Sequence, residues 1–194
     1  MKIMFFDTET TWFNPPAILQ IWIIIWEYEE DWKIIKEENI DLLFNPNEEI
    51  HESASNIHWF TIDKVENEPF FKTFIPKFVK YVKEVDIIVW HNVQFDIKAI
   101  EFEINRLYIE QKKELDKKVI NFLQSTKDKS KCTMLSAVNF CKLPNPRGWY
   151  KWPKLLELHK ILFDKEFDCA HNAMADIQAT RDCFFELKKR NIIT

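Results

Sequence analysis

The stretch KIMFFDTET, residues 2–10, passes from an apolar run directly into acids. The run Lys2–Phe6 is typical of a short buried strand, which places the acids at the carboxyl end of that strand. Side chains two residues apart on a strand share a face, so Asp7 and Glu9 can point the same way. Carboxylates that converge repel each other unless a cation lies between them. This first strand therefore predicts a candidate cation site at its end.

The segments that follow predict two more strands. Ile18–Tyr28 is a long β-branched apolar run, too rich in isoleucine to favour a helix, and is interpreted as a central strand. A turn at Asn14-Pro15-Pro16 precedes it. A hairpin turn at Glu29-Glu30-Asp31 leads into a return strand over Lys33–Phe44, which Asn45-Pro46-Asn47 ends. The chain thus opens with three strands.

The rest of the chain mixes helices with further strands. Apolar spacing predicts helices over Pro69–Lys83, Val93–Leu107, Trp152–Leu162 and Asn172–Arg190, and a strand over Asp86–Trp90. Four stretches are interpreted more loosely: 48–68 as polar and irregular, 110–131 as a lysine-rich solvated helix or loop insertion, 132–143 as mixed apolar, and 144–148 as a loop. For 110–131, a specific role in binding nucleic acid is the less favoured alternative to a solvated surface segment. This order predicts an α/β fold with a mixed sheet.

Composition excludes several classes of protein. The single glycine, Gly148, cannot build a G-x-G-x-x-G or a P-loop motif. Four cysteines at irregular spacing argue against a zinc site and a disulfide framework, and favour free thiols in a reducing compartment. The net charge of −4 gives no basic footprint for nucleic acid, although an acidic metal site would offset local basic patches in that count.

The amino-terminal sequence bears on location. The chain reaches an acid at Asp7, so no signal peptide is predicted. The longest apolar run, around Ile21–Trp26, is far shorter than the ~20 residues that span a bilayer. We expect a cytoplasmic protein with no membrane partner.

Three clusters carry the candidate chemistry: Phe6–Thr10, His91–Asp96 and His171–Asp176. Each has an ordinary structural explanation when taken alone. Strand-end acids are usually solvated, Asp96 suits the first turn of a helix, and His171 suits the neighbourhood of a helix cap. Those explanations leave Asp176 unexplained, because the apolar spacing places it on the buried side of its helix, where an acid needs a partner or a metal.

Carboxylates without sulfur ligands favour Mg²⁺ or Mn²⁺ over zinc. Four carboxylates can hold a pair of such ions about 3.5–4 Å apart, an arrangement used in phosphodiester displacement. A neutral histidine beside such a site is suited to take a proton from an attacking water.

The same clusters resemble the three motifs of the DnaQ-like (DEDDh) 3′–5′ exonuclease superfamily, which includes the proofreading epsilon subunit of bacterial DNA polymerase III. The resemblance runs in order from residue 2 to about 188, and 110–131 is its least matched part. The five-residue spacing from His171 to Asp176 is similar to the His subclass. Ile57–Thr61 and Lys151–Leu155 also resemble stretches of the family.

The resemblance implies a ribonuclease H-like three-layer fold. Its five-stranded mixed sheet, with the second strand antiparallel, would be flanked by helices in a single exonuclease domain, residues 1–194. It implies that two divalent cations, Mg²⁺ or Mn²⁺, are held by four acids, Asp7, Glu9, Asp96 and Asp176. One ion would activate the water and the other would stabilise the leaving 3′ oxygen. His171 would be the general base.

The resemblance also places Thr10, Phe13, His58 and Asn92 near the terminal nucleotide, with core packing as the alternative for Phe13. The implied activity releases nucleoside 5′-monophosphates from nucleic-acid 3′ ends in DNA proofreading or repair. Single-stranded DNA is the first substrate to consider, and a DNA polymerase subunit is a candidate partner. An RNA-trimming exonuclease of the same family and a catalytically inactive nucleic-acid- or polymerase-binding module are the alternatives. The complete set of acids argues against the inactive module.

Tryptophans stand where the family often has glycine or another small residue. The family usually has glycine at the position of Trp12 and often has glycine or another small residue at those of Trp22, Trp59 and Trp90. Trp32 lies in the predicted hairpin turn, where glycine is the natural choice, and Trp149 follows Gly148 in a loop. Our hypothesis is that the organism reads the UGA codon as glycine and that these residues come from translating UGA as tryptophan. The heavy use of lysine, isoleucine, phenylalanine and asparagine indicates an AT-rich coding sequence, which fits such a reassignment. The alternative is a genuinely tryptophan-rich variant, in which an indole at position 12 or 59 would crowd the approach of a substrate strand.

Overall fold

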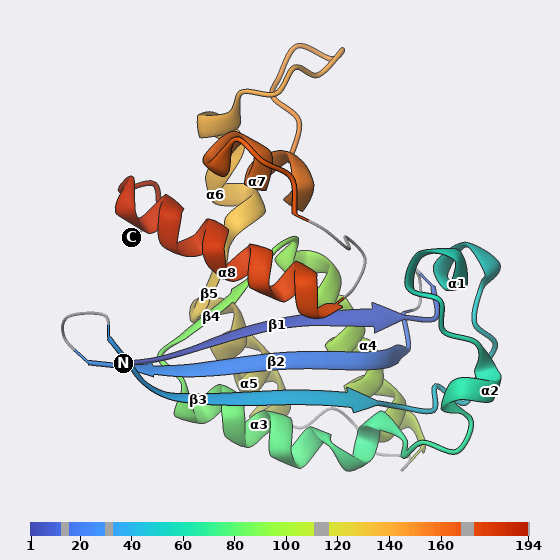
Figure 1. Ribbon diagram of the computed structural model, residues 1–194. Helices are drawn as coiled ribbons and strands as arrows, with labels where there is room; N and C mark the ends of the chain where they lie inside the picture. Colours follow the sequence, from blue (N-terminus) through green and yellow to red (C-terminus); the bar gives the residue numbers. More distant parts are fainter. Residues whose placement is uncertain (13–15, 30–32, 111–116, 168–172, 194) are drawn as a thin grey trace.

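Five strands form one mixed sheet in the order β3-β2-β1-β4-β5 (Figure 1). Their bounds are β1 (Lys2–Thr10), β2 (Ile18–Tyr28), β3 (Ile34–Leu43), β4 (Ile87–Trp90) and β5 (Ser130–Cys132). In this computed structural model, residues 1–12, 16–29, 33–110, 117–167 and 173–193 are described. β2 is antiparallel to β1 and β3, whereas β4 is parallel to β1 and β5. The predicted mixed sheet with an antiparallel second strand is confirmed.

Helices cover both faces of the sheet. They are α1 (Glu52–His58), α2 (Ile62–Val65), the 3₁₀ turn η1 (Phe71–Thr73), α3 (Ile75–Glu84), α4 (Val93–Glu110), α5 (Lys117–Asp128), α6 (Thr133–Cys141), α7 (Leu155–Phe163) and α8 (Ala173–Lys189). α3, α4 and α5 lie on one side, and α6, α7 and α8 lie on the other (Figure 1). This arrangement is the expected three-layer fold. None of the described helices is both long and apolar enough to cross a membrane.

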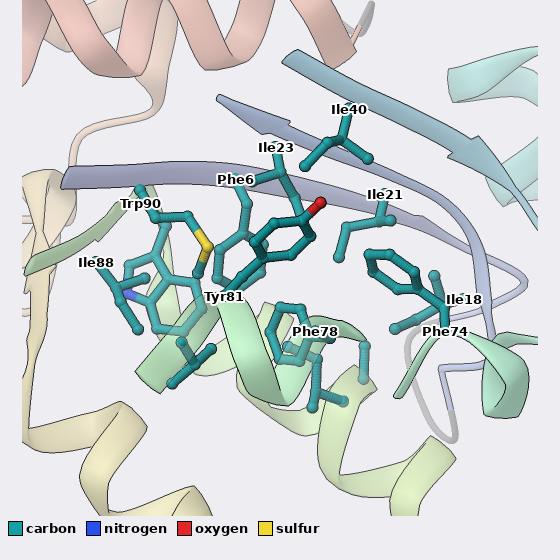
Figure 2. Close-up of a cluster of buried hydrophobic side chains, with 14 of the residues drawn as sticks. Phe6, Ile18, Ile21, Ile23, Ile40, Phe74, Phe78, Tyr81, Ile88 and Trp90 are labelled. Atoms are coloured by element: carbon teal, nitrogen blue, oxygen red, sulfur yellow. The ribbon is translucent and has the colours of Figure 1, made fainter. Parts of the chain in front are cut away.

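β1 divides its side chains between two cores. Met4 and Phe6 pack with α3 and α4 in the cluster drawn in Figure 2, where the Phe6 ring lies 4.3 Å from that of Trp90. Ile3 and Phe5 point the other way and pack against α7 and α8. Each large apolar side chain that is buried contributes about 1.5–3 kcal/mol, so the two cores together fix the orientation of the strand.

This alternation continues into the acidic end of β1. Asp7 and Glu9 follow the parity of Phe5 and therefore lie on the α8 side, whereas Thr8 follows Phe6 on the α4 side. A shift of the β1–β2 pairing at Glu9/Thr10 marks the end of the regular ladder. Beyond it, the Thr11 amide donates to the Ala17 carbonyl over 2.9 Å and closes the connection to β2.

Several loosely interpreted stretches contain regular structure. Residues 48–68 were expected to be irregular, but they hold α1 and α2; the ring Nδ1 of His51 caps α1 by accepting from the Ser53 amide. The stretch 110–131 holds α5 and continues into the short strand β5, and the mixed apolar stretch holds α6.

Two predicted helices begin later than expected. The segment over Pro69–Lys83 starts with η1, and α3 begins only at Ile75, with a proline in its first turn. The helix predicted from Trp152 begins at Leu155, after Lys154, whose amide donates to the Glu157 carboxylate over 2.9 Å. The proline in the first turn of α3 and the contact of Glu157 with the Lys154 amide at α7 mark these two boundaries, which the apolar spacing did not show.

Candidate active site

The acids at the end of β1 carry strongly perturbed carboxyl groups. Asp7 and Glu9 are half-buried. Burial raises the pKa of Glu9 to about 8, and the nearby charges of Asp176 and Asp96 add to this effect. Burial also holds the pKa of Asp7 well above its usual value, with further contributions from Asp96, Glu9 and Asp176. Both carboxylates therefore resist ionisation when no cation is near.

Asp96 lies in the first turn of α4 and is only 2% exposed. Its Oδ1 accepts a hydrogen bond from the Thr8 hydroxyl over 2.7 Å. Burial raises the pKa of Asp96 to about 7, although the hydrogen bond from Thr8 opposes the rise. The sequence reasoning assigned no role to Thr8. Its position between Asp7 and Glu9, on the opposite face of the strand, could have suggested that it supports the site.

Asp176 completes the acidic group from α8. It lies in the first turn of the helix and is half-buried. Thr180 and Cys183, four and seven residues later, are both buried, so Asp176 is on the side of α8 that faces the sheet. Its charge raises the pKa of both Asp7 and Glu9. Three elements thus bring Asp96 and Asp176 within electrostatic range of Asp7 and Glu9.

The donor set fits hard divalent cations. All four side chains offer only carboxylate oxygens, and three of them have raised pKa values that a nearby cation would reverse. Among the described residues, no three or more His, Cys, Asp or Glu side chains are already gathered tightly enough to hold a metal ion. The acids are therefore neighbours that would have to draw together around a cation. His171 lies outside the described residues.

His58 fastens α1 to the end of β1. Its Nδ1 accepts a hydrogen bond from the Phe60 amide over 3.0 Å, and its Nε2 lies 3.2 Å from the Thr10 carbonyl. Since a carbonyl can only accept, Nε2 carries the proton. Burial lowers the pKa of this imidazole, which keeps it neutral. Both ring nitrogens are thus occupied by backbone groups, and the buried ring lies 5.2 Å from that of Phe60.

The other predicted nucleotide contacts lie at the same end of the sheet. Thr10 is buried, and its hydroxyl donates to the Trp12 carbonyl over 3.1 Å. Asn92 is exposed just before α4, and its φ of +66° is a conformation that asparagine tolerates better than most residues. Phe13 lies outside the described residues.

His91 is an anchor that the sequence reasoning did not identify. Its Nε2 lies 3.1 Å from the Pro153 carbonyl and carries the proton, and its Nδ1 lies 2.9 Å from the Thr133 hydroxyl, which is also 3.2 Å from the Trp90 carbonyl. Burial lowers its pKa to about 4, which keeps the ring neutral near pH 7. His91 thus ties the end of β4 to α6 and to the segment before α7. Contacts between residues 42 and 62 positions apart leave no local signal.

Comparison with known proteins identifies a family and several relatives for this chain. The exonuclease family model RNase_T matches residues 4–184. DNA polymerase III subunit epsilon of Buchnera aphidicola from Schizaphis graminum is 32% identical over 109 residues, covering 55% of this chain and 46% of that protein. The epsilon subunit of Rickettsia prowazekii is 28% identical over 107 residues, again 46% of its length. This chain thus spans about half the length of these relatives.

Solved structures share the fold. E. coli Exonuclease I in complex with a dT13 oligonucleotide superposes with a TM-score of 0.69 at 17% identity, covering 98% of this chain and 41% of that one. Exonuclease X in complex with 5′ overhanging duplex DNA gives 0.58 at 18% identity, covering 97% and 93%. The family match extends over nearly the whole chain and includes the ends of β1 and β4 and the start of α8. The chain therefore belongs to the DnaQ-like 3′–5′ exonuclease family.

Proposed function

We propose that residues 1–194 act as one metal-dependent exonuclease domain that hydrolyses the terminal phosphodiester bond at a nucleic-acid 3′ end and releases a nucleoside 5′-monophosphate. The observation that carries this proposal is a group of four acids from β1, α4 and α8, in which the charges of Asp96 and Asp176 raise the pKa of both Asp7 and Glu9. Such a group is costly to keep near neutral pH unless it binds cations. It occurs at the carboxyl end of β1, in a chain of the exonuclease family.

Asp7, Glu9, Asp96 and Asp176 would hold two cations, Mg²⁺ or Mn²⁺. Bound there, the cations would lower the pKa of a water and offset charge on the leaving 3′ oxygen. Thr8 orients Asp96 through its hydroxyl. His171 would accept the proton of the attacking water, a role that rests on the five-residue spacing to Asp176. Thr10, Phe13, His58 and Asn92 would border the terminal nucleotide.

DNA is the substrate we propose, in proofreading or repair. The curated relatives are DNA polymerase III epsilon subunits, and two of the similar solved structures hold a dT13 oligonucleotide and a 5′ overhanging duplex DNA. By the same reasoning, a DNA polymerase subunit is the proposed protein partner and the cytoplasm the proposed location. An RNA-trimming activity remains the second candidate, because discrimination through the 2′-hydroxyl depends on details of pocket shape.

The test is a degradation assay on 3′-labelled single-stranded DNA, duplex DNA and RNA with Mg²⁺ or Mn²⁺. We expect mononucleotide release from single-stranded DNA that stops on addition of EDTA and is absent in Asp7→Ala. Protein carrying glycine at the six doubtful tryptophan positions should be assayed in parallel. Failure of both proteins to shorten any of the three substrates would contradict the enzyme proposal and favour an inactive binding module.

A further inference from the structure

The connection between α6 and α7 is basic and aromatic. Residues 142–154, which we call the aromatic hairpin, contain Lys142, Arg147, Lys151 and Lys154 and no acid, in a chain whose net charge is −4. The segment projects from the α6–α7 side of the fold (Figure 1). It therefore places positive charge on a molecule that is acidic as a whole.

Three aromatic side chains of the hairpin face solvent. Trp149, Tyr150 and Trp152 are 59%, 43% and 57% exposed. Their backbone is held in place: Pro144 and Tyr150 form an antiparallel bridge, and the Lys151 amide donates to the Leu143 carbonyl over 3.0 Å. Large exposed rings on an ordered backbone are unfavourable in water and are typical of a binding surface.

The carboxyl-terminal end of the hairpin is attached beside the end of β4. This end is fixed by the hydrogen bond between the Pro153 carbonyl and His91, the residue at the end of β4 that directly precedes Asn92. Beyond Pro153 the chain enters α7, which packs on α8, the helix that carries Asp176. The base of the hairpin is thus anchored between β4 and α8, while the hairpin itself projects away from the sheet (Figure 1).

We infer that the aromatic hairpin binds single-stranded nucleic acid upstream of the nucleotide that is removed, with its rings stacking on bases and its cations contacting phosphates. Every base has a π-face, so such stacking tolerates any sequence, as a processive or repair exonuclease requires. Arg147 and Lys142 make no ion pair with the described residues, which leaves their charges for phosphates. The inference rests on the proposed function only for the direction of the strand.

Tyr150 and Trp152 carry the inference without Trp149. Trp149 is one of the positions where the coding sequence is in question, and glycine there would leave two exposed rings two residues apart. The experiment therefore uses variants of these two residues alone.

The first measurement is equilibrium binding of fluorescein-labelled dT15 to the full chain in EDTA, which needs no catalysis. We expect Tyr150→Ala/Trp152→Ala to weaken binding about 10-fold or more, and Trp152→Phe to stay within about 3-fold of the wild type. Arg147→Glu should weaken binding and lower the slope of log affinity against log salt by about one or more. Phe70→Ala is the matched control, because Phe70 is 39% exposed beside η1, whose Lys72 pairs with Glu110 at the carboxyl-terminal end of α4.

The second measurement separates this inference from the exonuclease proposal. The double variant should raise KM for a 15-nucleotide strand while hydrolysing a mononucleotide aryl ester of thymidine 5′-phosphate like the wild type. Unchanged dT15 affinity in the double variant would overturn the inference and leave the surface to a protein partner. Equal losses on the long and the minimal substrate would also overturn it, since they would indicate a structural role. Absence of hydrolysis in the wild type would contradict only the proposed function, because binding is measured without it.

Discussion

The hydroxyl of Thr8 on β1 donates a 2.7 Å hydrogen bond to the carboxylate of Asp96 on α4, across 88 positions of sequence. The bond connects the strand that carries Asp7 and Glu9 to the helix that carries Asp96. Thr8 lies on the face of β1 opposite those two acids. It therefore fixes the position of the Asp96 carboxylate relative to Asp7 and Glu9 without itself belonging to the acidic group.

Replacing Thr8 by valine should lower kcat at least about 10-fold, because a hydrogen bond to a charged group contributes about 1.5–3 kcal/mol and its loss frees the Asp96 carboxylate. Thr8→Ser keeps the hydroxyl and should restore most of the activity. Steady-state kinetics on a labelled single strand, with melting temperatures to confirm folding, make the comparison. Equal kcat for the valine variant and the wild type would contradict a positioning role.

Stability of the metal-free protein should fall as pH rises from about 5 to 8. The raised pKa values, about 8 for Glu9 and about 7 for Asp96, mean that the folded state holds protons in this window that the unfolded state has released. The free energy of unfolding then decreases with pH. Urea denaturation in EDTA at pH 5.5, 7 and 8 measures this trend. Glu9→Gln should flatten it, and a steeper fall in that variant would refute the assignment.

Divalent cations should reverse this trend. Binding to the ionised carboxylates stabilises the folded state, and more so at pH 8 than at pH 5.5, where protons compete. We expect Mn²⁺ or Mg²⁺ to raise the melting temperature of the wild type at pH 8 by several degrees. Asp7→Asn/Asp176→Asn should lose most of this shift. A cation effect that is equal at both pH values would argue against binding at this acidic group.

Asp7→Asn should stabilise the metal-free fold and abolish hydrolysis. The substitution removes a carboxyl group whose pKa is held well above its usual value and which therefore lowers the stability of the metal-free fold near neutral pH, while cation binding loses a ligand. We expect kcat to drop by several orders of magnitude with an unchanged or higher melting temperature in EDTA. A destabilised Asp7→Asn protein would show that the carboxylate is a structural group.

Trp59→Gly should stabilise the protein by about 1 kcal/mol, since a left-handed backbone costs about 1–2 kcal/mol in any residue with a Cβ. Trp59 caps α1 at a φ of +63° and is 72% exposed, so little packing is lost. Trp26→Gly is the contrasting variant. Its indole donates to Glu37 over 2.7 Å and lies under Arg181, so we expect a loss of about 3–5 kcal/mol. Thermal melts of both variants provide the comparison.

The structure also separates the doubtful tryptophans from one another. Trp90 is fully buried, and its indole nitrogen has no hydrogen-bond partner among the described residues, a cost of about 1–3 kcal/mol. It nevertheless packs closely on Phe6. Trp32 lies outside the described residues. The coding DNA decides the matter: UGA codons at these six positions would support reassignment to glycine, and UGG codons would end it.

The features that could be predicted are those that depend on side-chain spacing within a single strand or helix. The period of a strand predicted that Asp7 and Glu9 share a face, and the apolar spacing over 172–190 predicted that Asp176 lies on the buried side of its helix. The three residues of β5 were not predicted, because their pairing with Ile88–Trp90 is the only reason they are extended. α1 was missed for a different reason: its cap is a histidine, outside the usual set of serine, threonine, aspartate and asparagine. The anchoring roles of His58 and His91 depend on long-range backbone contacts that no spacing reveals.

The two cores on either side of β1 also select the strand register on which the positions of the acids depend. If β1 slipped by one residue against β2, Phe5 and Phe6 would exchange cores, and Thr8 would face α8 where Asp7 and Glu9 belong. The packing of Phe5 and Phe6 in separate cores therefore fixes the register of β1. The same register places Asp7 and Glu9 on the face of β1 that the site requires.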